Sequence, residues 1–83
     1  MNKGQHQFVS LGFNNMVAVK RIIAVVSADA APIRRLIKDA RKINKLIDAT
    51  NGRRTRAVII SDSDHIILSS AQPETFAQRI EQK

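Results

Sequence analysis

The sequence predicts an α+β fold in which two helices pack with a twisted, mainly antiparallel sheet, in the order ββ-α-βββ-α. Three observations support this prediction. Short runs rich in Ile and Val are separated by Gly, Asn, Asp and Ser, which are typical of turns between strands. Two segments that begin near Pro32 and Pro73 instead space their apolar residues as helices do. No repeat or low-complexity linker interrupts the 83 residues, so 1–83 is expected to form one domain.

The chain is expected to begin with a flexible polar tail, 1–7, followed by two strands. The first strand is predicted at 8–11, and the Gly and Asn residues after it indicate a turn. The second strand is predicted within 16–26. Its last five residues are all apolar, which indicates a strand that is covered on both faces.

The first helix is predicted to begin after Ser27 and to run to about Asn44 or Lys45. Ser27 or Asp29 could accept hydrogen bonds from the free backbone amides at its start, and Pro32 suits the first turn, where no amide donor is needed. An apolar stripe follows the i, i+3, i+4, i+7 spacing of one helix face. Its residues are Ile33, Leu36, Ile37, Ala40, Ile43 and Ile47.

The opposite arc of this helix is basic. It carries Arg34, Arg35, Lys38, Arg41, Lys42 and Lys45. Asp39 is the one acid near them, whereas solvated surfaces normally mix both signs of charge. Two interpretations therefore stay open. The arc is either a solvated face or an auxiliary phosphate-binding surface that includes Arg34, Arg35 and Lys38.

Three more strands are predicted at about 46–49, 55–61 and 65–70. Asn51-Gly52 lies between the first two of them and is the strongest short-range signal for a tight hairpin turn, because both residues accept positive φ. The segment 62–64, Asp-Ser-Asp, predicts a second hairpin turn. Its side chains are expected to bond to neighbouring backbone amides.

Pro73 is predicted to open the last helix, with Phe76, Ala77 and Ile80 on its buried face. The strands before it are apolar on both faces. Two short helices can cover one face of a sheet, so the other face is expected to need cover from a neighbouring subunit.

Three arginines, Arg53, Arg54 and Arg56, follow the Asn-Gly turn with no acid among them. A guanidinium group stays charged and can donate two hydrogen bonds to a phosphate through its planar fork. The cluster therefore favours binding of an anion or a nucleic acid. The alternative is a solvated turn whose arginines only keep the surface soluble.

The charge balance also indicates a polyanionic partner. The chain has 14 Lys and Arg against 7 Asp and Glu, a formal net charge of +7, which suits DNA, RNA or an anionic membrane. Three Phe without Tyr or Trp argue against a protein that binds single strands by stacking bases on aromatic rings. No segment is long and apolar enough to span a bilayer, so the protein is expected in the cytoplasm.

The sequence offers little catalytic chemistry. Asp62, Asp64 and His65 could in principle chelate a cation, but their spacing lacks the full calcium-loop pattern, so a plain polar turn is favoured. Ser69 and Ser70 lack the pattern of a nucleophile elbow. The sequence therefore predicts no enzymatic activity and no metal, cofactor or small-molecule substrate. Because no cysteine can staple so small a chain, oligomerisation is a reasonable way to complete its core.

Six motifs lie between residue 12 and residue 75, and the similarity to a known family that they carry extends over nearly everything from residue 8 to residue 80. They are Gly12-Phe13-x-Asn15-x-Val17, Arg21-Ile22-Ile23-Ala24-x-Val26-Ser27, Ala31-Pro32-Ile33, Leu46-Ile47-Asp48-Ala49-Thr50-x-Gly52-Arg53-Arg54-Thr55-Arg56-Ala57-Val58-Ile59-Ile60, Asp62-Ser63-Asp64-His65 and Ser69-x-x-Gln72-Pro73-Glu74-Thr75. Together they resemble the RemA family of bacterial regulators of extracellular-matrix genes. A combined pattern of this length is highly specific.

The resemblance implies a DNA-binding transcriptional activator that assembles into a ring and contacts DNA through repeated basic sites. In that family the positions of Arg21, Arg53 and Arg54 bind DNA, and Pro32 has a structural or assembly role. Arg21 is expected to join the same phosphate-binding patch as the other two. Arg56 is expected to add to the DNA contacts or to support the loop, while Gly52 keeps the turn.

The chain departs from the family pattern in three ways. Asn14 stands where the family usually has glycine, Asn51 stands where it usually has tyrosine, and the first helix is more basic. The leading hypothesis is a ring-forming homo-oligomer that binds double-stranded DNA in the nucleoid. The alternatives are an RNA-binding or general architectural nucleoid protein, and a membrane-surface protein that uses the basic helix.

Overall fold

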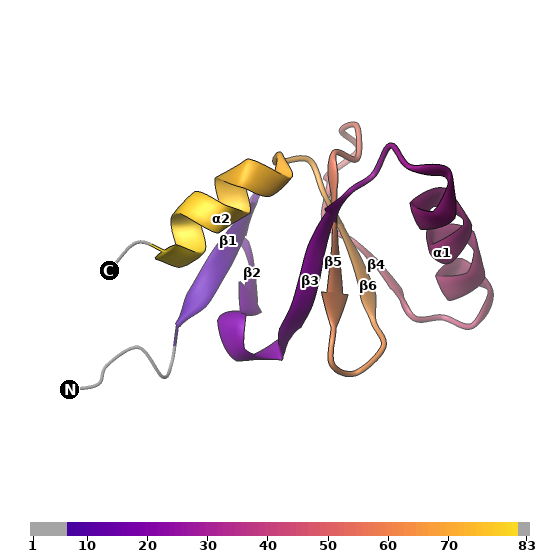
Figure 1. The fold of residues 1–83 in the computed structure, drawn as a ribbon, viewed down its shortest axis with the longest axis horizontal. Helices are drawn as coiled ribbons and strands as arrows, with labels where there is room; N and C mark the ends of the chain where they lie inside the picture. The colour runs from indigo at the N-terminus through magenta and orange to yellow at the C-terminus, as the bar shows by residue number, and fades with distance from the viewer. Residues whose placement is uncertain (1–6, 82–83) are drawn as a thin grey trace.

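A four-stranded sheet lies at the centre of the domain, with one helix on each side of it (Figure 1). A computed structural model of the protein describes residues 7–81. The predicted flexible tail, 1–7, therefore lies outside the described residues except for Gln7. The strands of the central sheet, in spatial order, are β3 (Ile22–Ser27), β5 (Ala57–Ser61), β6 (Ile66–Ser69) and β4 (Leu46–Asp48).

The central sheet is mainly antiparallel, as predicted. β5 pairs antiparallel with both β3 and β6, whereas β4 pairs parallel with β6 at the edge of the sheet. Side chains alternate between the two faces of a strand, so Val58 packs on the side of the first helix while Ile59 packs on the opposite side. Both are fully buried, which explains why the strand is apolar at consecutive positions.

The first two strands form a separate hairpin. β1 (Phe8–Gly12) pairs antiparallel with β2 (Asn15–Ala18), and the turn between them places Phe13 at φ 55° and Asn14 at φ 67°. Positive φ at both central positions is typical of the tight turns that join antiparallel strands. The observed Asn14 thus occupies a backbone conformation that asparagine tolerates better than most residues.

The prediction of a single strand within 16–26 is wrong. A 3-10 turn, η2 (Val19–Arg21), divides it into β2 and β3, which belong to different sheets. An unbroken strand would turn either Lys20 or Arg21 toward a buried face, because side chains alternate along a strand. The 3-10 turn leaves both of them exposed. The element order is therefore βββ-α-βββ-α with two sheets, and not ββ-α-βββ-α with one.

The two helices cover opposite faces of the central sheet (Figure 1). One core cluster, on the side of α1 (Ala31–Lys42), contains Ala28, Ala40, Val58, Ile66 and Leu68. The other, shared by α2 (Pro73–Glu81) and the β1–β2 hairpin, contains Val9, Leu11, Ala49, Ala57, Ile59, Ile67 and Phe76. The prediction that both helices share one face and that a neighbouring subunit covers the other is wrong, because the hairpin and α2 together cover the second face.

Polar contacts tie the hairpin to its neighbours. Arg79 of α2 donates from Nη1 to the backbone oxygen of Ser10 at 2.6 Å, and the buried hydroxyl of Ser69 in β6 donates to the backbone oxygen of Leu11 at 3.2 Å. Ser69 is fully buried, so this bond satisfies a hydroxyl that would otherwise be costly to bury. The hairpin therefore belongs to the same packed domain as the central sheet.

The first helix begins as predicted but ends earlier. Pro32 lies in the first turn of α1, while the residue that caps its start is Ala30, which makes no side-chain hydrogen bond to the helix. Neither Ser27 nor Asp29 is the cap, and the Ser27 hydroxyl instead accepts from the backbone amide of Asp29 at 3.3 Å. The helix ends at Lys42, before Asn44 adopts a left-handed φ of 61°.

The predicted apolar stripe of this helix is therefore only partly buried. Ile33, Leu36, Ile37 and Ala40 pack against the sheet, whereas Ile43 lies beyond the helix and Ile47 belongs to β4. Ile43 and Ile47 are 66% and 47% exposed, because the left-handed residue between them ends the helical register.

The connection from β4 to β5 differs from the predicted hairpin. Asn51 and Gly52 do form a tight turn, with φ values of 56° and 79° and a 3.0 Å hydrogen bond from the Arg53 amide to the Thr50 carbonyl. The two flanking strands, however, are not neighbours, because β6 lies between them. The Asn-Gly signal reports the backbone conformation that these residues favour, and it does not determine which strands pair.

The second predicted turn, at 62–64, does join two paired strands. Asp64 has φ 67°, and its backbone amide donates to the Ser61 carbonyl at 3.1 Å. The expected local side-chain bonding comes from a serine, because the His65 amide donates to Ser61 Oγ at 3.2 Å. The Asp62 carboxylate bonds elsewhere in the fold.

The last helix, α2, begins at Pro73 as predicted. Phe76 is fully buried and Ile80 half-buried, while Ala77 is exposed, contrary to prediction. Neither α1 nor α2, the two α-helices of residues 7–81, has the length and apolar composition needed to cross a membrane.

Candidate nucleic-acid interface

The arginine loop, defined here as residues 49–56, connects β4 to β5 across the end of β6. Backbone bonds to β6 fix both of its ends. The Ala49 amide donates to the Leu68 carbonyl at 3.0 Å, and the Arg56 amide donates to the Ser69 carbonyl at 2.9 Å. The loop thus projects from a rigid part of the sheet, and its backbone has little freedom at either end.

An aspartate braces the first half of this loop. Asp48 Oδ1 accepts from the Thr50 amide at 2.9 Å and from Thr50 Oγ1 at 2.6 Å. These two hydrogen bonds hold the pKa of the Asp48 carboxyl below its ordinary value, because they favour the charged form. The bond from the Thr50 hydroxyl has the larger effect and the bond from the Thr50 amide the smaller one. Thr50 is buried at 2% exposure, so the turn that follows starts from a fixed point.

The three arginines of the loop are all exposed. The Arg53 guanidinium carbon lies 5.5 Å from the centre of the Phe13 ring, at the tip of the β1–β2 hairpin, within the range of a cation–π contact. Arg54 Nη2 lies 4.0 Å from Asp29 Oδ1, and both side chains are more than two-thirds exposed. An ion pair this long and this exposed is weak, so the Arg54 guanidinium is available to an external anion.

The start of α1 adds one more cation to this end of the sheet. Arg34 Nη2 donates to the backbone carbonyl of Asp29 at 2.8 Å, and Arg54 approaches the carboxylate of the same residue. The β3–α1 connection and the arginine loop meet there, because the Ala28 amide donates to the Arg56 carbonyl at 3.2 Å. We call this end, which carries Arg34, Arg53, Arg54 and Arg56, the loop end of the domain.

The basic arc of α1 is exposed along the helix. A depression of about 370 Å³ on its surface is lined by Arg34, Arg35, Ile37, Lys38 and Arg41. The packing agrees both with a solvated face and with an auxiliary phosphate contact, the two interpretations that the sequence left open. Of these side chains, Arg34 bonds to Asp29, whose carboxylate Arg54 of the arginine loop approaches.

Arg21 lies at the opposite end of the central sheet from the arginine loop. It directly precedes Ile22, which pairs with Ser61, whereas Ala57, the residue after Arg56, pairs with Ser27 at the other end of the same strands. The expectation that Arg21 joins the patch of Arg53 and Arg54 is therefore wrong within one chain. Among residues 7–81, Arg21 and the arginine loop therefore lie at two separate places on the surface.

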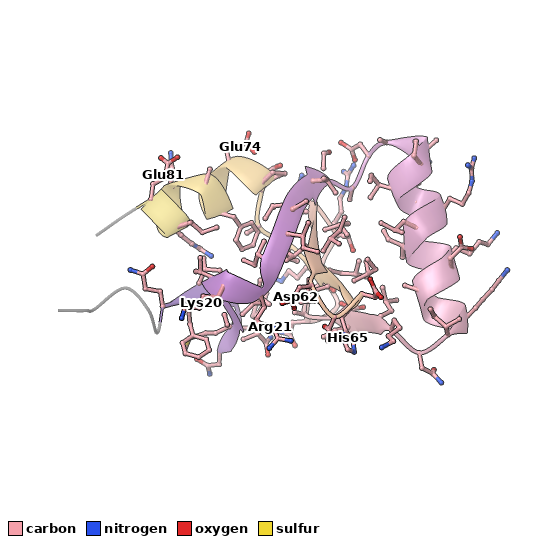
Figure 2. All side chains as sticks on the ribbon, turned by 60° about the horizontal axis from the view of Figure 1, so that its bottom comes forward. Lys20, Arg21, Asp62, His65, Glu74 and Glu81 are labelled. Atoms are coloured by element: carbon pink, nitrogen blue, oxygen red, sulfur yellow. The ribbon has the colours of Figure 1, made fainter. Side chains whose placement is uncertain are left out.

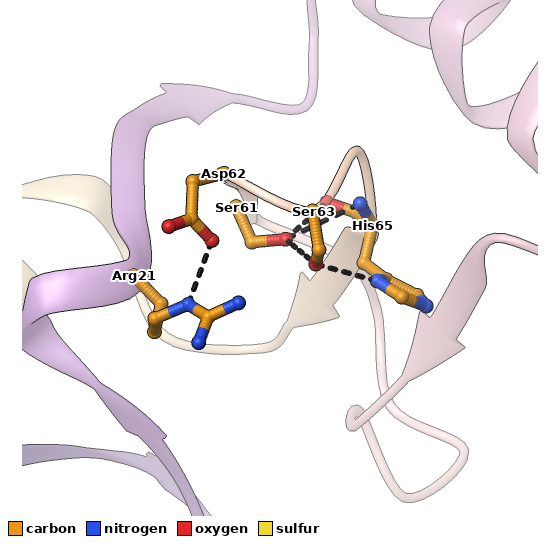
Figure 3. Close-up of polar contacts among 5 residues, drawn as sticks. All are labelled: Arg21, Ser61, Asp62, Ser63 and His65. Carbon is orange, nitrogen blue, oxygen red and sulfur yellow. Dashed lines mark hydrogen bonds and ion pairs between the residues drawn. The ribbon is translucent and has the colours of Figure 1, made fainter.

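The environment of Arg21 is built by the β5–β6 turn (Figures 2 and 3). Arg21 Nε donates to Asp62 Oδ1 at 2.7 Å. Behind it, Ser61 Oγ lies 2.9 Å from Ser63 Oγ, which lies 2.7 Å from His65 Nδ1. We call this end of the sheet, with Arg21 and the turn from Ser61 to His65, the turn end of the domain.

Asp62 and His65, considered above as cation ligands with Asp64, are engaged by protein groups. Across residues 7–81, no group of three or more His, Asp or Glu side chains could hold a metal ion.

The two residues with a predicted structural role lie at different places. Gly52 occupies the positive φ that the turn of the arginine loop requires, and Pro32 lies exposed in the first turn of α1.

Sequence reasoning missed the residues that support the arginines. Phe13 and Asp29 are distant from the loop in sequence, and no local pattern links them to it. The role of Asp48 could have been predicted from local sequence. An aspartate often accepts a hydrogen bond from the backbone amide two residues later, as in an Asx turn, and here that amide belongs to Thr50. The sequence predicts Asp62 in a polar turn, with cation binding as the less favoured alternative, and does not predict it as a partner of Arg21.

Comparison with known proteins agrees with the resemblance noted in the sequence. The model of the RemA-like family, described as extracellular matrix regulatory protein A-like, matches residues 8–80. A protein of Geobacillus thermodenitrificans is 64% identical over 74 residues, covering 89% of this chain and 85% of its own. One of Halalkalibacterium halodurans is 60% identical over 77 residues, covering 93% and 88%. Both bear the name "Putative regulatory protein".

Proposed function

The chain belongs to the RemA-like family, and we propose that it is a transcriptional regulator that binds double-stranded DNA. One observation supports this above all others: the anchored arginine loop presents Arg53 and Arg54 as exposed cations whose partners among residues 7–81 are weak. The names of its relatives assign them a regulatory role and no enzymatic one. The proposal requires neither a cofactor nor a metal.

The electrostatics suit phosphate contacts. The formal net charge is +7, and the loop end carries four arginines, two of which, Arg34 and Arg54, contact Asp29. Each phosphate that such a group neutralises releases counterions from the duplex, so affinity should fall steeply as salt rises. Phosphate contacts position a protein on DNA without reading its bases. Sequence preference should then come mainly from the bending and groove shape of the duplex.

A single domain offers few contacts at each end. We propose that copies assemble into a ring, so that Arg21 and the loop arginines recur at regular intervals along a bound duplex. Repetition of weak sites raises the overall affinity by orders of magnitude when the geometry allows them to bind together. By the resemblance to the family, the regulated genes would be those of the extracellular matrix, and the protein would act at the nucleoid.

The test replaces Arg54 with alanine. We expect Arg54→Ala to abolish the retardation of a duplex in a gel while leaving the mass of the oligomer, measured by light scattering, unchanged. Lys42→Ala is the matched control, because it removes the same charge from an exposed position on α1 that is outside the loop end. Equal binding by the two variants would overturn the assignment of Arg54.

Competition distinguishes DNA from RNA as the partner. An unrelated RNA duplex of equal length should displace the bound DNA poorly, because A-form geometry spaces its phosphates differently. Equal competition by RNA would favour the alternative of an RNA-binding or general architectural protein. Loss of the oligomer in Arg54→Ala would instead show that this arginine belongs to an assembly contact.

A further inference from the structure

Arg21 and Asp62 are joined twice at the turn end of the domain. The side chains meet through Arg21 Nε and Asp62 Oδ1 at 2.7 Å, and the Asp62 backbone amide donates to the Arg21 carbonyl at 2.9 Å. Forty-one positions separate the two residues in sequence. The pair thus connects the 3-10 turn before β3 to the turn between β5 and β6.

We infer that Asp62 is a positioning residue that holds the Arg21 guanidinium ready for a nucleic-acid phosphate. The inference rests on the proposed function. Asp62 bonds to Nε, and a guanidinium has five N–H donors, of which the four on its two terminal nitrogens make no hydrogen bond to a group of residues 7–81. Figure 3 shows one of these two nitrogens directed away from the carboxylate and the other lying beside the guanidinium carbon, with the dashed contact drawn to Nε. The two terminal nitrogens form the fork that binds a phosphate with two parallel hydrogen bonds.

The exposure of the pair argues against a mainly structural role. The side chains of Arg21 and Asp62 are 60% and 48% exposed. Ion pairs this exposed contribute little to folding, because water competes for both charges and ordering two long side chains costs entropy. A bond that adds little to stability can still order an arginine before its ligand arrives. The ordering cost is then met in the free protein, which increases affinity.

The turn that carries Asp62 is rigid. Ser61 is buried at 4% exposure, and its hydroxyl accepts from the His65 amide at 3.2 Å while contacting Ser63 Oγ at 2.9 Å. Ser63 Oγ in turn bonds to His65 Nδ1 at 2.7 Å. These bonds fix the backbone on both sides of Asp62, so its carboxylate is presented at a defined place. Asp62 is the only residue of this turn whose side chain contacts Arg21 among the bonds of residues 7–81.

The test is a double-mutant cycle read by affinity for a long duplex DNA of unrelated sequence. Arg21→Ala should weaken binding about tenfold, because a charge-assisted contact is lost. Asp62→Ala should weaken binding about threefold in the wild-type background and not at all in the Arg21→Ala background. Asp62→Asn should restore part of the loss, because its amide oxygen can still accept from Nε.

Asp64→Asn is the control for charge. It removes the same negative charge from the same turn, and asparagine tolerates the φ of 67° at this position. It should bind DNA as tightly as the wild type or slightly more tightly. The temperature of unfolding, measured for every variant, should be unchanged by Asp62→Ala within the small effect of an exposed ion pair.

Three results would overturn the inference alone. Tighter binding by Asp62→Ala than by Asp64→Asn would show that Asp62 masks Arg21 and does not present it. Equal losses from Asp62→Ala with and without Arg21 would show that it acts independently of that arginine. Unchanged binding by Arg21→Ala alongside a loss in Arg54→Ala would remove Arg21 from the interface and leave the proposed function intact. Absence of DNA binding by the wild type would overturn both.

Discussion

The loop end and the turn end of the domain position their arginines in different ways. At the loop end the backbone is fixed by bonds from Ala49 and Arg56 to β6, while the Arg53 side chain has a 5.5 Å cation–π contact and the Arg54 side chain a 4.0 Å ion pair. At the turn end the Arg21 side chain itself is held, at 2.7 Å by Asp62.

This difference suggests two ways of meeting the entropic cost of binding. A loop with a fixed backbone and free side chains can adapt to phosphates at several positions, and each arginine is ordered only when it binds. A side chain that is already ordered favours one phosphate position and binds it with less entropic loss. The DNA affinities of the two ends should therefore respond differently when the supporting residues are removed. Three variants at the loop end, compared with Asp62→Ala at the turn end, measure this difference.

The largest effect on stability is expected from Gly52→Ala, which strains the backbone of the arginine loop. Gly52 has φ 79°, a conformation in which a side chain with a β-carbon is strained by about 1–2 kcal/mol. No heavy atom lies within 4 Å of the added methyl, so the cost arises from the backbone and not from a clash. Urea unfolding should show this loss of stability, and DNA affinity should fall with it.

Asn51→Gly is the control for the loop variant, because glycine accepts the φ of 56° found there and should be nearly neutral. An unchanged DNA affinity in a destabilised Gly52→Ala protein would contradict the view that the loop end binds through a fixed backbone. It would mean that the arginines of the loop end do not depend on the turn that precedes them.

A smaller effect is expected from Asp48→Asn, which weakens the brace between Asp48 and Thr50. The stability loss at pH 7 should be at most about 1 kcal/mol, since the carboxylate is exposed to solvent. The folded-state pKa of Asp48 is lowered, so its contribution is fully present above the unfolded pKa of about 4 and is lost as the pH falls through the folded value.

The pH dependence provides the measurement for this variant. Urea midpoints of the wild type and Asp48→Asn should differ at pH 7 and converge below about pH 4, because the asparagine does not titrate. A gap that stays constant at acidic pH would contradict the account of the lowered pKa. The turn end should be unaffected, and Arg21→Ala should weaken DNA binding equally in both backgrounds.

The smallest effect is expected from Phe13→Leu, which removes the cation–π contact to Arg53 and keeps an apolar side chain. Such contacts at exposed sites are worth about 0.5–1 kcal/mol, so DNA affinity should change by less than about fivefold. Titration of a labelled duplex would measure it. A loss as large as that of Arg54→Ala would show that the Arg53 side chain is as firmly held as Arg21, which would remove the distinction between the two ends.

Much of the local structure could be predicted from the sequence. Pro32 and Pro73 lie in the first turns of the two helices, and Asn51 and Gly52 adopt positive φ, because these preferences depend on a residue and its immediate neighbours. The exposure of Arg53 and Arg54 followed from the same turn. The bonds that support them did not, since Phe13 and Asp29 reach the loop only through the packing of the hairpin and of α1.

The sequence by itself determined the turns, the helix starts, the two-sided apolar strands and the excess of positive charge. The tertiary structure alone decided that β6 lies between β4 and β5, that the helices cover opposite faces, and that Arg21 is separated from the arginine loop. Turn and helix preferences are set within a few residues. Strand order is set by the burial of both faces of the sheet, to which residues from the whole chain contribute at once.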